Sequence, residues 1–279
     1  MGATGITSII LIVLNVIISY KGFKNPSFFD KYKFEVDKIT LNRDYRRLVT
    51  SGFLHVNWMH LIFNVFSLYF FSQMVEALLG EAQFLTIYFG SLIAGNLFSL
   101  IVHKKDGYYS VVGASGAVCG LIFACIALAP GIGMRLIVIP MPIWIFGLLF
   151  VAASIYGVRS RRDNVGHEAH MAGAVVGMFI ALAFSPSSIV ENWPYILIVA
   201  LPCIAFIYII IKRPDLLLVD NLFFKTENYN YTVDQRYNMQ KVDKQKEIDR
   251  ILDKINRSGM KSLTAKEKQD LQEYSKITQ

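Results

Sequence analysis

Long apolar stretches separated by polar loops make up the first 212 residues of the chain. About twenty apolar residues are needed for a helix to cross a bilayer. This pattern predicts an all-α, polytopic membrane helix bundle with seven spans: Ile6–Tyr20, Trp58–Val75, Phe84–Val102, Ser115–Ala129, Pro142–Gly157, Ala169–Phe184 and Tyr195–Lys212. The first span has no basic segment before it and no small-residue cleavage site after it, so we expect a retained anchor.

Two polar segments lie outside these spans. Residues 21–57 mix charged side chains with aromatic ones such as Phe28 and Phe34, which is typical of a folded loop at the membrane interface. After Lys212 the sequence turns charged and polar. Helical spacing of Ile248, Ile251, Leu252 and Ile255, followed by the capping-box pair Thr264 and Glu267, predicts two short amphipathic helices there. Both a docking element and a partly ordered tail remain open interpretations.

Composition narrows the class of protein. Hydrophobic residues are 54% of the chain and its mean hydropathy is +0.42, values too apolar for an ordinary soluble domain. The net charge of +7 comes from loops and tail without a nucleic-acid motif, so we expect contact with lipid headgroups and no nucleic-acid partner. Cys119, Cys125 and Cys203 lie in apolar segments and are predicted to be buried packing residues.

Four polar residues inside the predicted spans are candidates for function, because polar groups are costly in a bilayer. They are His60, Asn64, Ser115 and His170. The second, fourth and sixth spans run in the same direction, so residues in their first turns lie at similar depth. We therefore expect all four residues to share one layer of the membrane.

Small residues allow two of these spans to approach closely. Gly116 with Gly120, and Gly173 with Gly177, form small-xxx-small faces. Close packing would let the Ser115 hydroxyl bond to the His170 imidazole, which is the arrangement of a nucleophile and its general base. His60 and Asn64, at i and i+4 on one helix, could donate to an oxyanion. A packing role is the alternative for each of these residues.

Other polar residues are expected to be structural. His55 is predicted to pack a loop, Glu76 to be a hydrogen-bond partner, and Asn96 to hold packed segments together. His167 and His170 have a spacing that could bind a metal, yet the adjacent Glu168 points to another helix face. We therefore expect no metal.

These residues together resemble the rhomboid family of intramembrane serine proteases. HLIFN at 60–64 is similar to the family's HxxxN, residues 113–116 to its GxSG, and AHMAG at 169–173 to its AHxxG. Val75, Glu76 and Gly80 look like the turn after the second span, and YRRLVTSGFLH at 45–55 resembles the first-loop motif, with Tyr45 replacing Trp. The resemblance divides the chain into a rhomboid-like six-helix core (residues 1–187), an additional transmembrane helix (188–212) and a polar tail (213–279).

The resemblance implies a serine endopeptidase that cleaves transmembrane proteins without a cofactor. Ser115 would be the nucleophile and His170 the base and then the acid. His60, Asn64 and the Ser115 amide would hold the oxyanion, with Gly113, Gly116 and Gly173 supporting the site. It also implies a multi-pass protein of the cell membrane, a water-accessible cavity that opens to the extracytoplasmic side, and a fifth span that gates substrate access.

The sequence departs from the family in two respects. Cys119 stands four residues after the serine, where an aromatic residue often packs on the catalytic imidazole, so either another ring does this or His170 is held less rigidly. Basic residues concentrate in loops that the positive-inside rule assigns to the cytoplasm, whereas the family's orientation, which we adopt, puts them outside. Two alternative functions are open. One is a catalytically silent relative that binds, escorts or retains membrane proteins, and the other is a transporter or metal carrier that uses the histidines.

Overall fold

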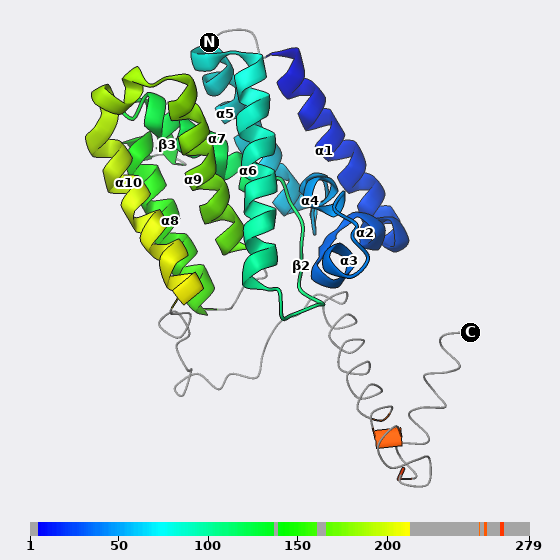
Figure 1. The fold of residues 1–279 in the computed structure, drawn as a ribbon. Helices are drawn as coiled ribbons and strands as arrows, with labels where there is room; N and C mark the ends of the chain where they lie inside the picture. Colours follow the sequence, from blue (N-terminus) through cyan, green and yellow to red (C-terminus); the bar gives the residue numbers. More distant parts are fainter. Residues whose placement is uncertain are drawn as a thin grey trace. The chain divides into compact units, whose positions relative to one another are not determined.

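The computed structural model describes residues 5–136, 139–160 and 166–212, together with residues 251, 254, 255, 263 and 264. The chain divides into two compact units, Met1–Asp220 and Asn221–Gln279. The first unit is a bundle of long helices (Figure 1): α1 (Ile6–Lys24), α5 (Trp58–Leu79), α6 (Glu81–Val102), α7 (Ser115–Leu128), α8 (Ile143–Ser160), α9 (His167–Phe184) and α10 (Ser187–Lys212).

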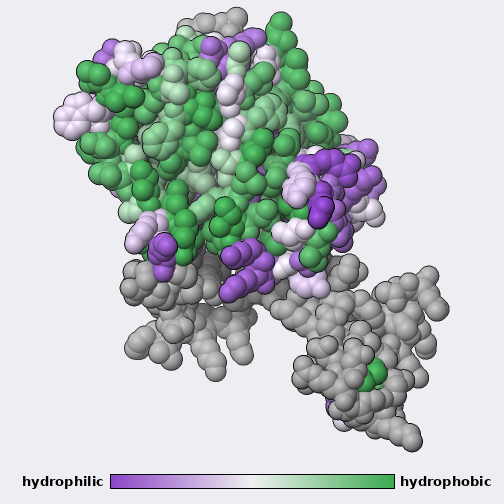
Figure 2. Space-filling model, in the orientation of Figure 1, coloured by the Kyte–Doolittle hydropathy of each residue, from purple (hydrophilic) through white to green (hydrophobic). Residues whose placement is uncertain are grey.

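The helices have the character expected of a membrane bundle. Among the described residues, five helices are long and apolar enough to cross a bilayer, namely α1, α5, α6, α9 and α10, while α7 and the apolar part of α8 are shorter. Figure 2 shows hydrophobic residues over the sides of the helices in view and hydrophilic residues at both ends. The predicted all-α, polytopic membrane fold is confirmed, and the chain is a multi-pass membrane protein.

The start of α10 differs from the prediction. We expected this helix to begin at Tyr195, but it begins at Ser187 and contains Pro194 and Pro202. Proline is tolerated inside membrane helices when neighbouring groups satisfy the freed backbone. The Asn192 amide donates to the carbonyls of Ala127 and Leu128, over 3.0 and 3.1 Å. This contact ties the first turns of α10 to the end of α7.

The segment between α1 and α5 is folded, as its mixture of charged and aromatic residues predicts. It contains α2 (Pro26–Tyr32), β1 (Phe34–Glu35), α3 (Val36–Thr40), α4 (Arg47–Thr50) and the 3-10 turn η1 (Ser51–Phe53). Strand β1 pairs antiparallel with β2 (Ser110–Val111), which precedes α7. The buried Arg47 guanidinium donates to the carbonyls of Asp30 and Lys33. The loop is therefore fixed to the chain leading into α7.

A hairpin precedes α8, where two prolines predict an irregular start. Strands β3 (Gly133–Leu136) and β4 (Ile139–Pro142) pair antiparallel, and α8 follows directly. Proline restricts the backbone and cannot donate in a helix, so α8 begins only after Pro142. The irregular start takes the form of a short hairpin.

Helix α7 lies at the centre of the bundle (Figure 1). It packs against α5, α6, α8, α9 and α10, and every residue from Gly116 to Ala127 is buried. Its 14 residues span about 21 Å at the α-helical rise, less than the roughly 30 Å of a hydrocarbon core. A central helix this short can begin below the membrane surface.

Helices α7 and α9 approach as closely as their glycines predict. A Cβ added to Gly173 would collide with the carbonyl oxygen of Gly116, and one added to Gly177 would collide with the backbone of Gly120. The predicted small-xxx-small contact between these helices is confirmed. It brings the first turns of α7 and α9 together.

We expect Gly173→Ala to lower the free energy of unfolding by about 1–3 kcal/mol, the usual cost of forcing atoms into a packed interface. Gly116→Ala is the matched control for stability, because its added methyl would find its nearest neighbour, the Ala169 carbonyl oxygen, at an ordinary 3.7 Å. Reversible unfolding in mixed micelles measures both variants. Equal losses in the two would contradict the close contact at Gly173.

In the second unit the structure describes only five residues. Ile251 and Leu263 are buried, and Ile255 packs against them. The other positions used to predict two amphipathic helices, namely Ile248, Leu252 and Glu267, lie outside the described residues. The two tail helices therefore stay a prediction.

Candidate active site

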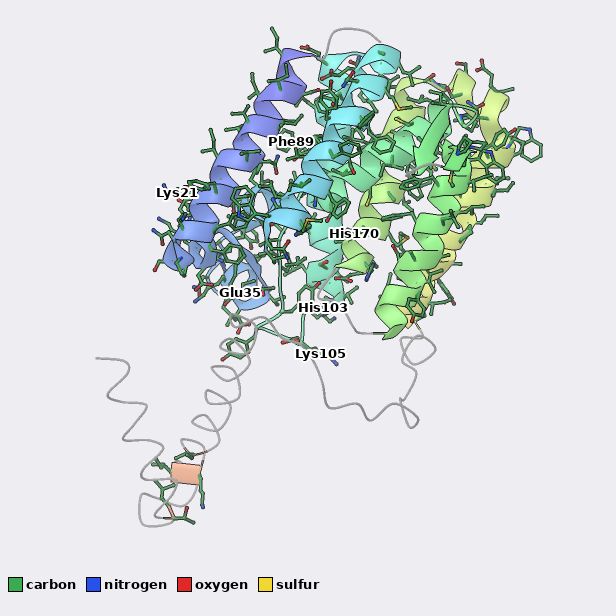
Figure 3. All side chains as sticks on the ribbon, turned by 180° about the vertical axis from the view of Figure 1, so that it is seen from behind. Lys21, Glu35, Phe89, His103, Lys105 and His170 are labelled. Carbon is green, nitrogen blue, oxygen red and sulfur yellow. The ribbon has the colours of Figure 1, made fainter. Side chains whose placement is uncertain are left out.

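Ser115 is the first residue of α7, and a glycine two residues earlier positions it. Gly113 has a φ of 130°, which L side chains rarely adopt, and it turns the chain from β2 into the helix. His170 lies in the first turn of α9 and is buried. Its Nε2 is 2.6 Å from Ser115 Oγ, a hydrogen bond that joins two helices through residues 55 positions apart. Figure 3 shows His170 within the bundle, in the half where His103 and Lys105 also lie.

His60 lies on the same side of Gly113 as the serine. It lies in the first turn of α5, where its backbone N–H donates to the Asn57 side chain over 2.8 Å. A Cβ built on Gly113 would be 2.9 Å from His60 Nε2 and 3.5 Å from Ser115 Oγ. The His60 imidazole and the Ser115 hydroxyl therefore flank a position that only glycine can occupy.

Asn64 is buried one turn further along α5, and its amide is turned to its own helix. Nδ2 donates to the His60 carbonyl over 2.9 Å. The structure thus brings Ser115, His170 and His60 together, whereas the hydrogen bond of Asn64 keeps it within α5. An amide nitrogen carries two hydrogens, so one N–H of Asn64 remains to donate elsewhere.

A small cavity adjoins the serine and the histidine. Its volume is about 10 Å³, and Ser115, His170 and the polar Asn96 are among its lining residues. That volume suits about one water molecule. Asn96 itself donates to the Leu48 carbonyl over 2.8 Å and to Ser51 Oγ over 3.2 Å, so it joins α6 to the loop as predicted.

Glu168 anchors the first turn of α9 through three donors. Its Oε1 accepts hydrogen bonds from Ser99 Oγ (3.0 Å), His103 Nε2 (3.2 Å) and Tyr109 OH (2.5 Å). The His103 and Tyr109 rings stack with centroids 3.5 Å apart. Burial and the neighbouring carboxylate raise the pKa of Tyr109 well above its usual range, so its phenol stays a donor. This network fixes the helix that carries His170.

Sequence reasoning missed the three donors to Glu168. The signal that could have indicated them is the carboxylate itself, because a charged group in the first turn of a membrane helix needs donors. It could not have identified the donors, which come from α6 and the following loop. Glu76 behaves as expected: it accepts from the backbone N–H of Gly5 over 3.0 Å and from the Ser8 hydroxyl.

His55 packs the loop against α1, also as expected. The Ser19 hydroxyl donates to the Phe53 carbonyl over 2.9 Å, which leaves its oxygen to accept from His55 Nδ1 at 2.8 Å. Burial is the main cause that lowers the pKa of His55 to about 3, and the nearby His60 adds to it. The buried ring is therefore neutral at physiological pH.

We expect the free energy of unfolding to fall as the pH is lowered from 6.5 towards 3, because the unfolded chain then binds a proton at His55 that the folded chain excludes. A single such proton contributes about 1.4 kcal/mol per pH unit. The free energy of unfolding, measured at several pH values for the wild type and for His55→Asn, gives this slope. The same slope in both proteins would contradict the assignment to His55.

The cysteines are buried and free, which confirms their predicted packing role. Within the described ranges there is no group of three or more His, Cys, Asp or Glu side chains that could hold a metal ion. His167 lies beside His170, with ring centroids 5.8 Å apart, and its ring contacts Gly157 of α8. It therefore belongs to the contact between α8 and α9.

Comparisons with known proteins agree with this architecture. Residues 42–187 match the Rhomboid domain family, and residues 231–277 match a family of unknown function. The chain is 42% identical to the rhomboid relative YdcA of Bacillus subtilis over 80 residues, which cover 29% of the chain and 39% of that relative.

Two relatives named as mitochondrial align over longer stretches. RHOMBOID-like protein 12 of Arabidopsis thaliana is 26% identical over 60% of the chain and 54% of its own length. Rhomboid protein 1 of Saccharomyces cerevisiae is 31% identical over 53% of the chain and 45% of its own length. The chain thus spans about half or less of these curated relatives. Because the family match covers more than half of the 279 residues and includes the paired helices α7 and α9, this chain belongs to the rhomboid family.

Proposed function

We propose that this protein is an intramembrane serine endopeptidase that cleaves transmembrane protein substrates with Ser115 as nucleophile and His170 as general base. The observation that carries the proposal is the 2.6 Å distance between Ser115 Oγ and His170 Nε2 inside the helix bundle. Family membership supports it, because rhomboids are intramembrane proteases or rhomboid-like proteins, and the family acts on transmembrane substrates.

Acylation uses the hydrogen bond between these two residues. His170 Nε2 takes the proton of Ser115 as Oγ attacks the scissile carbonyl carbon, and the carbonyl electrons move onto its oxygen. When the tetrahedral intermediate collapses, the carbon–nitrogen bond breaks. The imidazolium of His170 then gives its proton to the leaving amine. An acyl-enzyme on Ser115 remains.

The oxyanion of this intermediate needs donors already in position. The N–H of Ser115 is one, because first-turn N–H groups have no acceptor within their own helix and the amino end of α7 favours negative charge. His60 is the second, since its ring shares the Gly113 surface with Ser115. The remaining N–H of Asn64 is the third.

Deacylation repeats the steps with water. His170 takes a proton from a water molecule that attacks the ester carbonyl carbon. It then returns the proton to Ser115 Oγ as the ester carbon–oxygen bond breaks and the product leaves with a new carboxyl group. The water-sized cavity beside both residues supports access of that water. In this proposal the chain's own residues carry every step, without a cofactor or a metal.

The domain organisation and location belong to the same proposal. A six-helix core over 1–187 would carry the chemistry, with an additional transmembrane helix over 188–212 and a polar tail with two short amphipathic helices over 213–279. We propose the cell membrane, with the active site facing the extracytoplasmic side. Membrane fractionation tests the location, and protease protection of tags at Gln279 and in the first loop tests the orientation.

Cleavage of a single-span protein by the purified wild type in liposomes, together with labelling of Ser115 by a fluorophosphonate, tests the activity. Both are expected. The second candidate function is a catalytically silent protein that binds or escorts membrane proteins, and the turn of the Asn64 amide to its own helix favours it. Binding of a single-span protein with neither labelling nor cleavage would support that candidate and contradict the protease.

A further inference from the structure

One face of α8 contacts the two histidines of α9. The ring of Phe150 lies 6.0 Å from the His170 ring, with 39° between the planes. Gly157 follows two helical turns later on the same face, and a Cβ there would collide with the His167 ring. His167 and His170 are themselves three residues apart, so they share one face of α9. Two of the contacts between α8 and α9 are therefore made at these imidazoles.

Helix α7 carries a thiol and not a ring one turn after Ser115. The residue one turn after Ser115 is Cys119, which is buried, and a thiol is too small to cover an imidazole. Helix α7 instead supports the ring that α8 provides: Phe123 meets Phe150 edge-on, with centroids 6.2 Å apart and planes at 72°. Phe150 is thus held between α7 and α9.

We infer that Phe150 is a positioning residue for His170, supplied by α8 where α7 carries only Cys119. This inference rests on the proposed function of His170 as general base. Ring pairs at 4.5–7 Å are attractive beyond their burial, so Phe150 restricts rotation of the imidazole and keeps Nε2 directed at Ser115.

The contact between Phe150 and His170 is more stabilising once the imidazole is protonated. A cation within about 6 Å of an aromatic face is stabilised by the ring electrons, and His170 becomes a cation only when it takes the serine proton. An interaction that strengthens in the transition state raises kcat and leaves substrate binding unchanged. It also makes the position of the base depend on α8, so displacement of α8 removes the ring from His170.

The first test distinguishes the effect of losing the aromatic ring of residue 150 from the effect of losing side-chain volume. We expect Phe150→Leu and Phe150→Ala to lower kcat for a single-span substrate about three- to tenfold, with KM unchanged, and Phe150→Tyr to keep the wild-type kcat. Phe146→Ala is the matched control. Phe146 is also a phenylalanine packed against the core, and it lies one turn before Phe150, further from the contact of α8 with His167. Its truncation is expected to leave kcat unchanged.

The second test moves the ring to α7. Cys119→Tyr in the Phe150→Ala background is expected to restore kcat to within about twofold of the wild type. A readout that needs no activity accompanies it: the rate at which diethyl pyrocarbonate modifies His170, followed by mass spectrometry. This rate is expected to rise in Phe150→Leu and Phe150→Ala and to fall again in the double variant.

Wild-type kcat and an unchanged His170 modification rate in Phe150→Leu would overturn the inference and leave the proposed protease intact. If the alanine or double variants do not fold, Phe150→Leu and Phe150→Tyr decide the result alone. Undiminished cleavage by Ser115→Ala would instead overturn the proposed function. In that case the modification rates would still report whether Phe150 restrains the imidazole.

Discussion

Ser115→Ala is expected to reduce cleavage of a single-span substrate by roughly 10⁴-fold or more, towards the uncatalysed background, because it removes the hydroxyl that attacks the carbonyl carbon. The alanine should leave the bundle intact, since Ser115 is only half-buried at the helix start and the hydrogen bond it loses is to His170. Proteoliposomes containing the enzyme and a fluorescently tagged substrate, analysed by gel, provide the measurement.

The matched control is Ser110→Ala. Ser110 lies in β2, five positions before the candidate nucleophile, and is exposed, so its removal is expected to leave cleavage at the wild-type level. Fluorophosphonate labelling should disappear in Ser115→Ala and persist in Ser110→Ala. Cleavage that survives the loss of Ser115 would exclude it as the nucleophile.

His170→Gln is expected to reduce substrate cleavage by a factor similar to that of Ser115→Ala. Glutamine keeps a polar side chain in the first turn of α9 but cannot accept the serine proton and return it to a leaving amine. Fluorophosphonate labelling should therefore fail together with proteolysis, although Ser115 is still present. The rate of labelling, measured as a function of time and pH, checks this prediction.

The double variant provides the control for His170. If the two residues act as one unit, Ser115→Ala with His170→Gln is expected to be no worse than either single variant. Rapid labelling of His170→Gln would show that another group activates the serine. A large fall in unfolding free energy would show instead that the substitution disturbs the helix packing.

The positions of the site residues could be anticipated from a few sequence features. Spans of alternating direction put His60, Ser115 and His170 at one depth, and Gly173 and Gly177 of α9 allow this helix to touch α7. Both features depend on residues close in sequence to the site residues, so they can be recognised in one amino-acid sequence. The catalytic roles of these residues stay a prediction.

Other contacts could not have been predicted in this way. Tyr109 and Glu168 meet across 59 positions, and Phe150 reaches His170 from a different helix. No periodicity relates these pairs, because they depend on how helices rotate about their axes. The start of α10 could not be predicted because a proline usually marks a helix boundary, whereas this helix continues through Pro194. Asn192, two residues before that proline, bonds to the end of α7.

The shortness of α7 also bears on how the protein meets its lipid environment. Because other helices surround α7, lipid chains do not contact it, and its length carries no penalty for hydrophobic mismatch. The outer helices α5 and α6, each 22 residues long, match the bilayer thickness instead. The depth of Ser115 is consequently set by the protein scaffold, so membranes of different thickness should leave Ser115 at the same level within the bundle.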